Sequence, residues 1–276
     1  MGILNVTPDS FSDGGLLYEG EQMSVERAVA RALQMVEEGA DIIDIGGEST
    51  GPRSKDVSLE EELKRVIPVV KALKGKSQTK FQISVDTYKA EVARQVLEAG
   101  ADMINDVTAL RGDSELARVL AQYEKVPVIL MYAKDPTART TTEKVDYEDV
   151  MKTITHFLEE RIEFAVRSGI ARERIILDPG MGAFVSMEPK YSLEILRRLK
   201  ELQTLKLPVL VGASRKGFVG QILAEFKGKD TPLPVTERLE GSLTCALVAV
   251  INGAAIIRVH DVQATRRALN MLQAIQ

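Results

Sequence analysis

Side chains that can bind ligands or take part in chemistry recur at the ends of short apolar segments along this chain. There are eight such residues: Asn5, Glu48, Asp86, Asn105, Asp178, Lys216, Arg258 and His260. An isolated charge that is buried on folding costs several kcal/mol, so we interpret this recurrence as convergence on one shared ligand. Asp44 and Asp106 also follow apolar residues, and for these two a structural role as loop caps is the simpler interpretation.

The chemistry of these residues divides into two sets. Asp86, Asn105 and Asp178 offer carboxylate oxygens and one amide, which suit a flat heterocycle with donor and acceptor edges. The second set is basic and follows the last two apolar segments: it contains Lys216, Arg258 and His260, with Ser214 and Arg215 nearby. A cationic corner of this kind suits a phosphate group. Together the two sets predict a phosphorylated small molecule as the ligand.

The apolar segments that end at these residues predict parallel strands. They are rich in Ile, Val, Leu and Met without polar alternation, which is typical of strands buried on both faces. The predicted strands are residues 1–5, 41–46, 81–86, 102–106, 127–132, 174–178, 208–213 and 255–260. Amphipathic stretches between them predict helices, among them 24–38, 59–74, 89–99, 147–168 and 236–251; Ser58 and Glu61 form a capping box for the second.

Eight strands in alternation with helices favour an α/β protein with a TIM (β/α)8 barrel over an open doubly wound sheet. A short repeat supports this interpretation, because Gly39, Gly100 and Gly253 each end a predicted helix before a new strand. No glycine-rich nucleotide fingerprint favours the open sheet, which remains the alternative. We expect residues 1–276 to form one barrel domain with its site at the strand ends and phosphate near the seventh and eighth strands.

Composition excludes several other classes of protein. Lys and Arg number 36 against 40 Asp and Glu, which argues against a nucleic-acid or anionic-membrane surface. With one cysteine, Cys245, and two histidines, neither an internal disulfide nor a multi-histidine zinc site is expected. No apolar stretch reaches the ~18 residues of a membrane span, and no leader precedes Met1. We therefore expect a cytoplasmic protein.

Seven motifs in chain order make the sequence similar to a known family. They are NVTPDSFSDGG at residues 5–15, DIGGEST at 44–50, SVDT at 84–87, INDV at 104–107, DPG at 178–180, SRKGF at 214–218 and RVHD at 258–261. The first motif is long and highly specific, whereas each shorter motif would be weak on its own. Because all seven occur in order at predicted strand ends, the whole chain resembles dihydropteroate synthase.

The resemblance implies a transferase of folate biosynthesis that joins (7,8-dihydropterin-6-yl)methyl diphosphate to 4-aminobenzoate and releases pyrophosphate. It implies that the pterin is held by Asp86, Asn105, Asp178 and Lys216, and the diphosphate by Asn5, Thr50, Arg258 and His260. It places the aminobenzoate among Thr50, Pro52, Arg53, Phe184, Ser214, Lys216 and Gly217. It further implies Mg²⁺ as the cofactor, with Asn5 as a protein ligand, and a homodimer.

Three loops depart from the family pattern. Residues 49–53 read STGPR where relatives usually read Ser-Thr-Arg-Pro-Gly, and residues 131–133 read MYA in place of Met-His-Met. Residues 182–185 read GAFV in place of Gly-Phe-Gly-Lys, which is closer to the sulfonamide-insensitive synthases. Phe184 is therefore predicted to exclude sulfonamides, with neutral drift of the loop as the alternative. A non-catalytic pterin-binding relative and a methyltetrahydrofolate:corrinoid methyltransferase-like barrel remain alternative functions.

Overall fold

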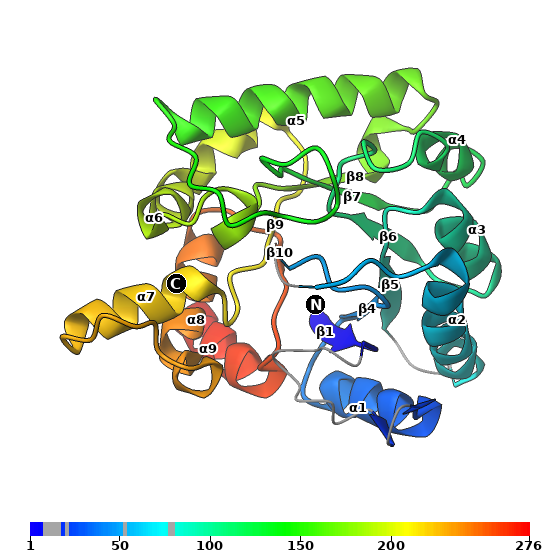
Figure 1. The fold of residues 1–276 in the computed structure, drawn as a ribbon, viewed down its shortest axis with the longest axis horizontal. Helices are drawn as coiled ribbons and strands as arrows, with labels where there is room; N and C mark the ends of the chain where they lie inside the picture. Colours follow the sequence, from blue (N-terminus) through cyan, green and yellow to red (C-terminus); the bar gives the residue numbers. More distant parts are fainter. Residues whose placement is uncertain (8–17, 20–21, 52–53, 77–80) are drawn as a thin grey trace.

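Eight parallel strands, one for each predicted strand, form a ring with helices around it (Figure 1). The computed structural model describes residues 1–7, 18–19, 22–51, 54–76 and 81–276. The strands of the ring are β1 (Gly2–Asn5), β4 (Ile42–Gly46), β5 (Gln82–Asp86), β6 (Met103–Asp106), β7 (Val128–Met131), β8 (Ile175–Asp178), β9 (Leu210–Val211) and β10 (Ile256–Ile257). Each lies inside its predicted range, so all eight strand predictions are confirmed.

Backbone hydrogen bonds close the ring into a barrel. The strands follow the order β1-β4-β5-β6-β7-β8, and β9 pairs with β10. Leu177 bridges to Val209 and Gly2 bridges to Val259, both in parallel register. These bridges join β8 to β9 and β10 to β1, so the eight strands pair all the way around. The predicted TIM (β/α)8 barrel is therefore confirmed, and the open doubly wound sheet is excluded.

Helices cover the outside of the ring. They are α1 (Val25–Glu37), α2 (Leu59–Gly75), α3 (Ala90–Glu98), α4 (Leu116–Ala121), α5 (Val150–Arg167), α6 (Pro189–Arg198), α7 (Gly217–Phe226), α8 (Leu239–Ile251) and α9 (Val262–Ile275). The five predicted helices are confirmed as α1, α2, α3, α5 and α8. Ser58 begins α2 as predicted, because its Oγ accepts the backbone N–H of Glu61 at 3.2 Å. Within the described ranges, no helix has the length and apolar character that crossing a membrane requires.

The repeated glycines end helices by adopting a left-handed backbone. Gly39, Gly100 and Gly253 have φ angles of 103°, 108° and 96°, a region that costs glycine little because it has no Cβ. This confirms the repeat predicted from the sequence. A small antiparallel pair between β1 and α1, formed by β2 (Tyr18–Glu19) and β3 (Gln22–Met23), was not predicted, because two-residue strands are too short to show a pattern.

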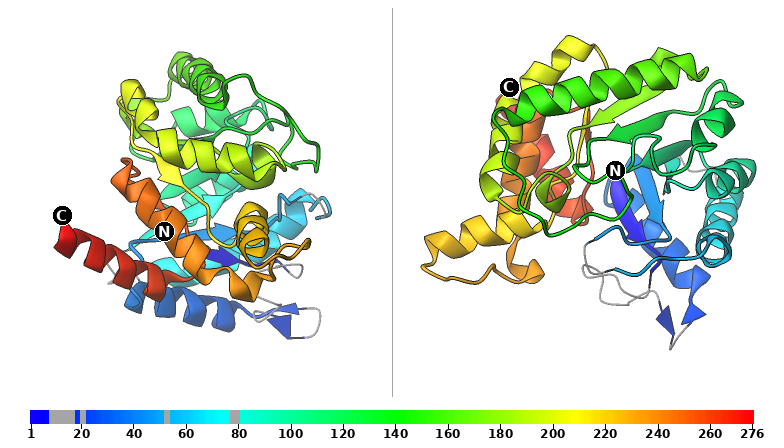
Figure 2. Two further views of the ribbon diagram at one scale, coloured as in Figure 1. Left: turned by 90° about the vertical axis from the view of Figure 1, so that its left-hand side faces the viewer. Right: turned by 45° about the horizontal axis from the view of Figure 1, so that its top comes forward.

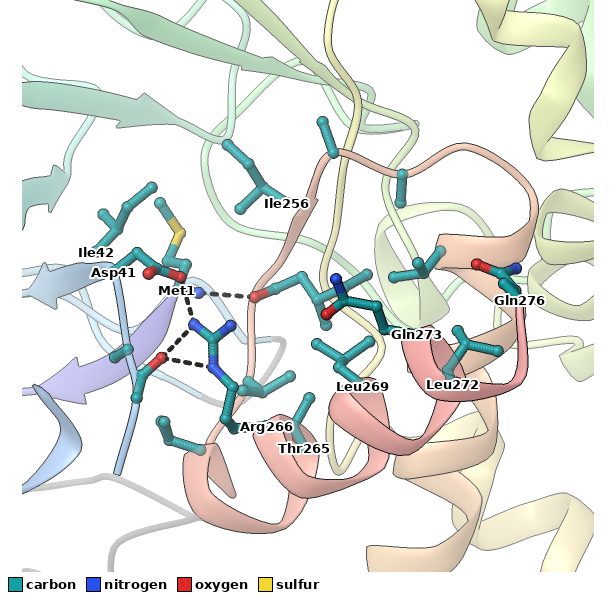
Figure 3. A pocket seen from close by; sticks show the side chains of 18 residues that line it. Met1, Asp41, Ile42, Ile256, Thr265, Arg266, Leu269, Leu272, Gln273 and Gln276 are labelled. Carbon is teal, nitrogen blue, oxygen red and sulfur yellow. Dashed lines mark hydrogen bonds and ion pairs between the residues drawn. The ribbon is translucent and has the colours of Figure 1, made fainter. Parts of the chain in front are cut away.

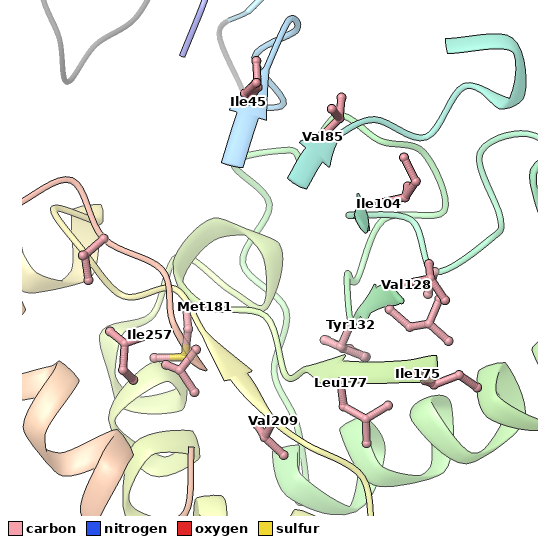
Figure 4. Packing of buried hydrophobic residues seen from close by; sticks show 14 of the residues in the cluster. Ile45, Val85, Ile104, Val128, Tyr132, Ile175, Leu177, Met181, Val209 and Ile257 are labelled. Atoms are coloured by element: carbon pink, nitrogen blue, oxygen red, sulfur yellow. The ribbon is translucent and has the colours of Figure 1, made fainter. Parts of the chain in front are cut away.

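Alternate residues of each strand face the helices and form the main hydrophobic core. Ile43 and Ile45 of β4 are both fully buried in this core. Figure 4 shows the corresponding side chains of successive strands around the ring, among them Val85, Ile104 and Val128. Because successive side chains of a strand point to opposite faces, the remaining residues of these strands must face the barrel interior.

The barrel interior is apolar toward one end and polar toward the other. One inward-facing layer consists of Ile42, Met103, Ile129, Ile176 and Leu210, which form a cluster separate from the main core. Two residues further along the same strands come Asp44, Asn105, Met131, Asp178 and Gly212. Side chains two residues apart share a face, so a largely polar layer lies on the apolar one at the C-terminal ends of the strands.

The opposite end of the barrel has a cavity of its own, of about 490 Å³ (Figure 3). There α9 lies beside α1 (Figure 2, left), and Arg266 of α9 donates to the Gly39 carbonyl at 2.9 Å and to Asp41 at 2.6 Å. Most of the side chains that line this cavity are apolar. In TIM barrels catalysis takes place at the C-terminal ends of the strands, so we place the site at the polar end.

Candidate active site

The polar end of the barrel opens into a cavity of about 460 Å³. Seven of the predicted site residues line it: Asn5, Thr50, Asp86, Ser214, Lys216, Arg258 and His260. Asn105 and Asp178 lie in the polar layer of β6 and β8, and are only 4% and 6% exposed. The structure therefore brings the predicted heterocycle set and the predicted basic set to the same end of the barrel.

Arg258 lies at the centre of a charged network inside the barrel. Its Nε donates to Asp44 Oδ2 at 2.6 Å, and a terminal nitrogen donates to Asp86 Oδ2 at 3.0 Å. The side-chain amide of Asn105 donates to the same Asp44 oxygen at 3.0 Å. The interpretation of Asp44 as a loop cap is thus wrong. Its strand position has the inward parity of Ile42, which places its carboxylate, fully buried, in the polar layer.

For Asp106 the loop-cap interpretation is confirmed. Its Oδ1 accepts the backbone N–H of Thr108 at 2.8 Å, and its Oδ2 accepts that of Leu110 at 2.6 Å. Asp106 directly follows Asn105 in β6 and therefore faces away from the barrel interior. Strand parity is the signal in the sequence that separates this structural aspartate from Asp44.

Burial shifts three ionisable groups of the site toward neutral pH. It raises the pKa of Asp86 to about 7, although the neighbouring Arg258 opposes the shift. It raises the pKa of Asp178 to about 6, against the opposing effects of the Gly180 backbone N–H and of Lys216. It lowers the pKa of Lys216 to about 8. Groups that exchange protons this close to neutrality are typical of functional sites.

Lys216 connects the Asp178 side of the site to the start of α7. Its Nζ donates to the Met181 carbonyl at 3.1 Å and lies 4.8 Å from the centroid of the Phe184 ring. Lys216 is also the residue that precedes α7, which begins at Gly217. The first backbone N–H groups of a helix have no partner within it, so α7 can present donors to an anion here.

The basic corner carries less positive charge than the sequence predicts. Burial, reinforced by the neighbouring Arg258, lowers the pKa of His260 to about 3, so its imidazole is neutral at physiological pH. Arg215 pairs with Asp261 at 2.5 Å, and the charge of Arg258 is offset by the two carboxylates it contacts. The predicted cationic corner is therefore corrected to one in which His260 acts by hydrogen bonding.

Ser214 determines how His260 presents its ring. The Ser214 Oγ accepts the His260 backbone N–H at 3.2 Å and lies 3.1 Å from Nδ1 of the same histidine. We propose that the hydroxyl, which can rotate, donates its hydrogen to Nδ1. The imidazole then keeps its hydrogen on Nε2, where it can donate to a ligand oxygen.

Glu48, although it follows a strand end, is engaged by the scaffold. Lys89 Nζ lies 2.7 Å from Glu48 and 2.6 Å from the buried carboxylate of Glu62. These contacts fix the start of the second loop, the segment between β4 and α2, against α2 and α3. Thr50 of the same loop reaches the cavity. Pro52 and Arg53 lie outside the described residues, and so do residues 8–15 of the first motif.

Arg139 is a residue near the site that the sequence analysis missed. It belongs to the loop of residues 132–149 after β7, and its guanidinium lies 3.0 Å from the Glu48 carboxylate. The next residue, Thr140, donates its backbone N–H to the Thr50 carbonyl at 3.2 Å. Arg139 follows no strand end directly and belongs to none of the seven motifs, so no sequence signal marks it.

Comparison with known proteins matches this geometry to one family. The family model described as pterin binding enzyme matches residues 1–260. The chain is 44% identical to dihydropteroate synthase of Synechocystis sp. over 275 residues, which cover 100% of this chain and 89% of that protein. It is also 44% identical to dihydropteroate synthase of Escherichia coli K12, with 99% and 90% covered.

Solved structures agree with the sequence comparison. Dihydropteroate synthase of Yersinia pestis, solved with a sulfonamide drug complex, superposes with a TM-score of 0.89 at 40% identity, covering 100% of this chain and 93% of that chain. The Xanthomonas albilineans enzyme with 4-aminobenzoic acid gives a TM-score of 0.85 at 44% identity, with 100% and 92% covered. The chain therefore belongs to the pterin-binding enzymes and, within them, to the dihydropteroate synthases, transferases of folate biosynthesis.

Proposed function

We propose that the polar end of the barrel divides the dihydropteroate synthase reaction among three subsites. The observation that carries this proposal is that the buried carboxylate of Asp178 and the partly buried carboxylate of Asp86 both act electrostatically on Lys216 at the polar end of the barrel. Release of pyrophosphate on mixing (7,8-dihydropterin-6-yl)methyl diphosphate with 4-aminobenzoate tests the whole assignment, because neither a non-catalytic relative nor a methyltransferase would produce it.

The pterin subsite consists of Asp86, Asn105, Asp178 and Lys216. Ionised Asp178 accepts hydrogen bonds from the ring N–H and the adjacent amino group, while Asn105 offers both a donor and an acceptor. Lys216 donates to an acceptor of the ring and offsets the charge of Asp178. Support comes from the positions of Asn105 and Asp178, which are buried and occupy inward-facing positions at the ends of β6 and β8.

The diphosphate subsite consists of Asn5, Thr50, Arg258 and His260. When the CH₂–O bond breaks, the electron pair leaves with the diphosphate, and the pterin ring stabilises the positive charge left on the carbon. Arg258 and the Nε2–H of His260 stabilise the negative charge that develops on the leaving group. The aminobenzoate nitrogen then forms a bond to the CH₂ carbon and loses a proton, which requires no strong base from the protein.

A divalent cation fits this subsite only together with the substrate. In the described part of the chain, no group of three or more His, Cys, Asp or Glu side chains is placed to hold a metal. Asn5 lines the cavity and supplies one neutral oxygen, while Mg²⁺ usually takes phosphate oxygens and water for its other ligands. We propose that Mg²⁺ binds through the diphosphate with Asn5 as its protein ligand, where it would neutralise phosphate charge.

The aminobenzoate subsite lies where the second loop, the sixth loop and α7 meet. Its proposed residues are Thr50, Pro52, Arg53, Phe184, Ser214, Lys216 and Gly217. The N-terminus of α7 at Gly217 supports this placement, because its free N–H groups suit the substrate carboxylate. Within this set Ser214 contacts His260, which places it on the side of the pocket toward the diphosphate.

The protonation states of the pterin subsite predict a bell-shaped pH profile. We expect kcat/KM for the pterin diphosphate to fall below pH 6–7, as Asp178 and Asp86 with pKa values of about 6 and 7 take up protons. It should fall again above pH 8, as Lys216 with its pKa of about 8 loses its proton. Initial rates from pH 5 to 9.5 measure the profile, and a flat profile would contradict these roles.

Phe184 is expected to discriminate against sulfonamides. Its ring contacts Lys216 and packs with Met131, Ala133 and Ala138. A ring held in this way leaves room for a flat aminobenzoate but clashes with a bulkier sulfonyl substituent. Phe184→Gly should lower the ratio of the sulfamethoxazole inhibition constant to the aminobenzoate KM by about tenfold. A wild-type ratio near one that this substitution leaves unchanged would instead indicate neutral drift of the loop.

The remaining features of the chain are also proposals. We propose a homodimer, supported by the apolar side chains of Phe226 and Ile251, which are 89% and 48% exposed at the ends of α7 and α8. A cytoplasmic location agrees with the single cysteine. That residues 1–276 act as one domain stays a prediction. It is supported by α9, which follows the residues that the family model matches and packs against α8.

A further inference from the structure

Residues 134–141, which we call the strap, connect the sixth loop, between β8 and α6, to the second loop, between β4 and α2. At one end, Lys134 donates its backbone N–H to the Phe184 carbonyl at 2.8 Å. At the other end, Thr140 donates its backbone N–H to the Thr50 carbonyl at 3.2 Å, and its hydroxyl donates to the Ala183 carbonyl at 2.8 Å. The strap thus contacts both Thr50 and Phe184, which come from separate loops.

Arg139 makes most of the side-chain contacts between the strap and the second loop. Its guanidinium donates to Glu48 Oε1 at 3.0 Å, to Asp56 Oδ1 at 2.7 Å and to the Ser49 carbonyl at 3.2 Å, and it also contacts Ser54 Oγ. Two carboxylates offset its charge, so Arg139 is not available as a primary ligand for an anionic substrate. Its planar fork joins four points of one loop, which a lysine could not do.

The strap itself is stiff enough to transmit this restraint. The Asp135 carboxylate accepts a hydrogen bond from the Thr141 backbone N–H at 2.9 Å. Its Oδ2 also lies 3.0 Å from the Thr140 hydroxyl, whose single hydrogen it shares with the Ala183 carbonyl. From the barrel side, Arg111 donates to the carbonyls of Ala133 and Asp135, both at 2.9 Å. The conformation of the segment is therefore held by Asp135 within it and by Arg111 from the barrel side.

Lys89 holds the other side of the same loop. Its Nζ contacts Glu48 Oε2 at 2.7 Å, while Arg139 contacts Oε1, and the Glu48 side chain is only 5% exposed. Lys89 ties Glu48 to α2 and α3, and Arg139 ties it to the strap. Loss of Arg139 would leave the start of the loop anchored by Lys89 but would remove the strap contacts with Ser49, Ser54 and Asp56. Of the strap contacts described above, only the Thr140 hydrogen bond would then hold Thr50.

We propose that Arg139 is a positioning residue that sets the spacing between Thr50 and Phe184, and thereby the affinity for aminobenzoate. The inference rests on the proposed aminobenzoate subsite, whose walls these two residues form. A displacement of about 1 Å in a positioning element can cost up to about a hundredfold in rate. Asp86, Asn105 and Asp178 of the pterin subsite lie on β5, β6 and β8, to which the strap contacts described above do not extend. Thr50 also belongs to the proposed diphosphate subsite, so the effect should be larger for aminobenzoate than for the pterin diphosphate.

The test compares Arg139→Met with Arg266→Met. Arg266 is a matched control, since it also joins a carboxylate and a backbone carbonyl but does so at the opposite end of the barrel. Arg139→Met should raise the aminobenzoate KM about tenfold and the KM for the pterin diphosphate by a clearly smaller factor. Arg139→Lys should give an intermediate aminobenzoate KM, because it keeps the charge and loses the fork. Arg266→Met should leave both KM values unchanged.

Failure of the positioning role and failure of the proposed subsite give different results. An aminobenzoate KM that Arg139→Met leaves within about twofold of the wild-type value would overturn the positioning role, and so would an equal rise in both KM values. If Arg139→Met does not fold, as judged by thermal unfolding, Arg139→Lys decides on the same criteria. Failure of the proposed subsite would appear differently, as an aminobenzoate KM that is insensitive to Phe184→Gly, or as wild-type protein that releases no pyrophosphate.

Discussion

Replacement of Asp178 by asparagine is expected to lower kcat/KM for the pterin diphosphate by about a hundredfold or more. The carboxylate can accept hydrogen bonds at both oxygens, whereas asparagine turns an N–H group toward the ring N–H of the pterin. The substitution also removes one of the two negative charges that favour the charged form of Lys216. The turn after β8 should survive, because the side-chain oxygen of asparagine can still accept the Gly180 N–H that Asp178 Oδ1 accepts at 2.8 Å.

Asp102→Asn is the matched control for this substitution. Asp102 also accepts a backbone N–H, from Ile83 at 2.9 Å, and also lies beside a lysine, Lys74 at 3.0 Å. It lies at the start of β6, however, at the end of the barrel away from the site. Calorimetric titration with the pterin diphosphate should show strong loss of binding for Asp178→Asn and none for Asp102→Asn. Affinity close to wild type in a folded Asp178→Asn variant would remove Asp178 from the pterin subsite.

The strands and the end of the barrel that holds the site could be predicted because both depend on local patterns. Each strand belongs to a short, mostly apolar run, and a polar residue at or just after its end marks the C-terminal end, where parallel strands bring their ends together. The alternation of side chains along each strand would have extended the prediction to which residues face the barrel interior. Counting in steps of two from Ile42 reaches Asp44, which shows that this aspartate faces inward, and the same count separates Asn105 from Asp106.

The electrostatics of the site could not be predicted, because they depend on partners distant in the sequence. Arg258 and Asp44 are 214 residues apart and meet only when the ring closes. Judged by residue type alone, Arg258 is a free cation and His260 is a group that titrates near neutral pH. Burial beside Arg258 makes the histidine neutral. Net charge at a site therefore has to be counted after pairing, and the residue types alone overestimate it.

The strap escaped prediction for a different reason. Arg139 lies in a polar stretch with neither strand nor helix periodicity, and its partners Glu48 and Asp56 lie 91 and 83 residues away. Sequence similarity drew attention to the altered loops around the aminobenzoate pocket, but it gave no indication that residues 134–141 connect two of them. A contact of this kind follows from how the loops pack above the barrel, which no local pattern encodes.

Replacement of Arg258 by methionine is expected to destabilise the fold as well as abolish turnover. The guanidinium pairs with Asp44, which is fully buried, and with Asp86, whose side chain is 14% exposed. Removal of one partner from a buried ionic network typically costs about 3–5 kcal/mol, because it leaves uncompensated charge. Urea unfolding at pH 8 should show this loss, and Arg266→Met, whose partner Asp41 is largely exposed, should lose far less.

The stability deficit of Arg258→Met should depend on pH in a defined direction. Burial raises the pKa of Asp86 to about 7 while Arg258 opposes the shift, so removal of Arg258 raises this pKa further. A raised pKa in the folded state contributes stability that is lost as pH rises through that pKa. Wild type completes this loss near pH 7, whereas the variant continues to lose stability above it, so the gap should widen from pH 6 to pH 8.

Adding Asp44→Asn to Arg258→Met tests whether stranded charge is the cause. The second substitution removes one of the two carboxylates left without a cationic partner. The amide oxygen of the new asparagine can still accept a hydrogen bond from Asn105, which in the wild type donates to Asp44 Oδ2 at 3.0 Å. The double variant should therefore recover part of the stability lost at pH 8. If it is less stable than Arg258→Met alone, the loss arises from packing of the arginine side chain, and the ionic network does not determine the stability of the barrel interior.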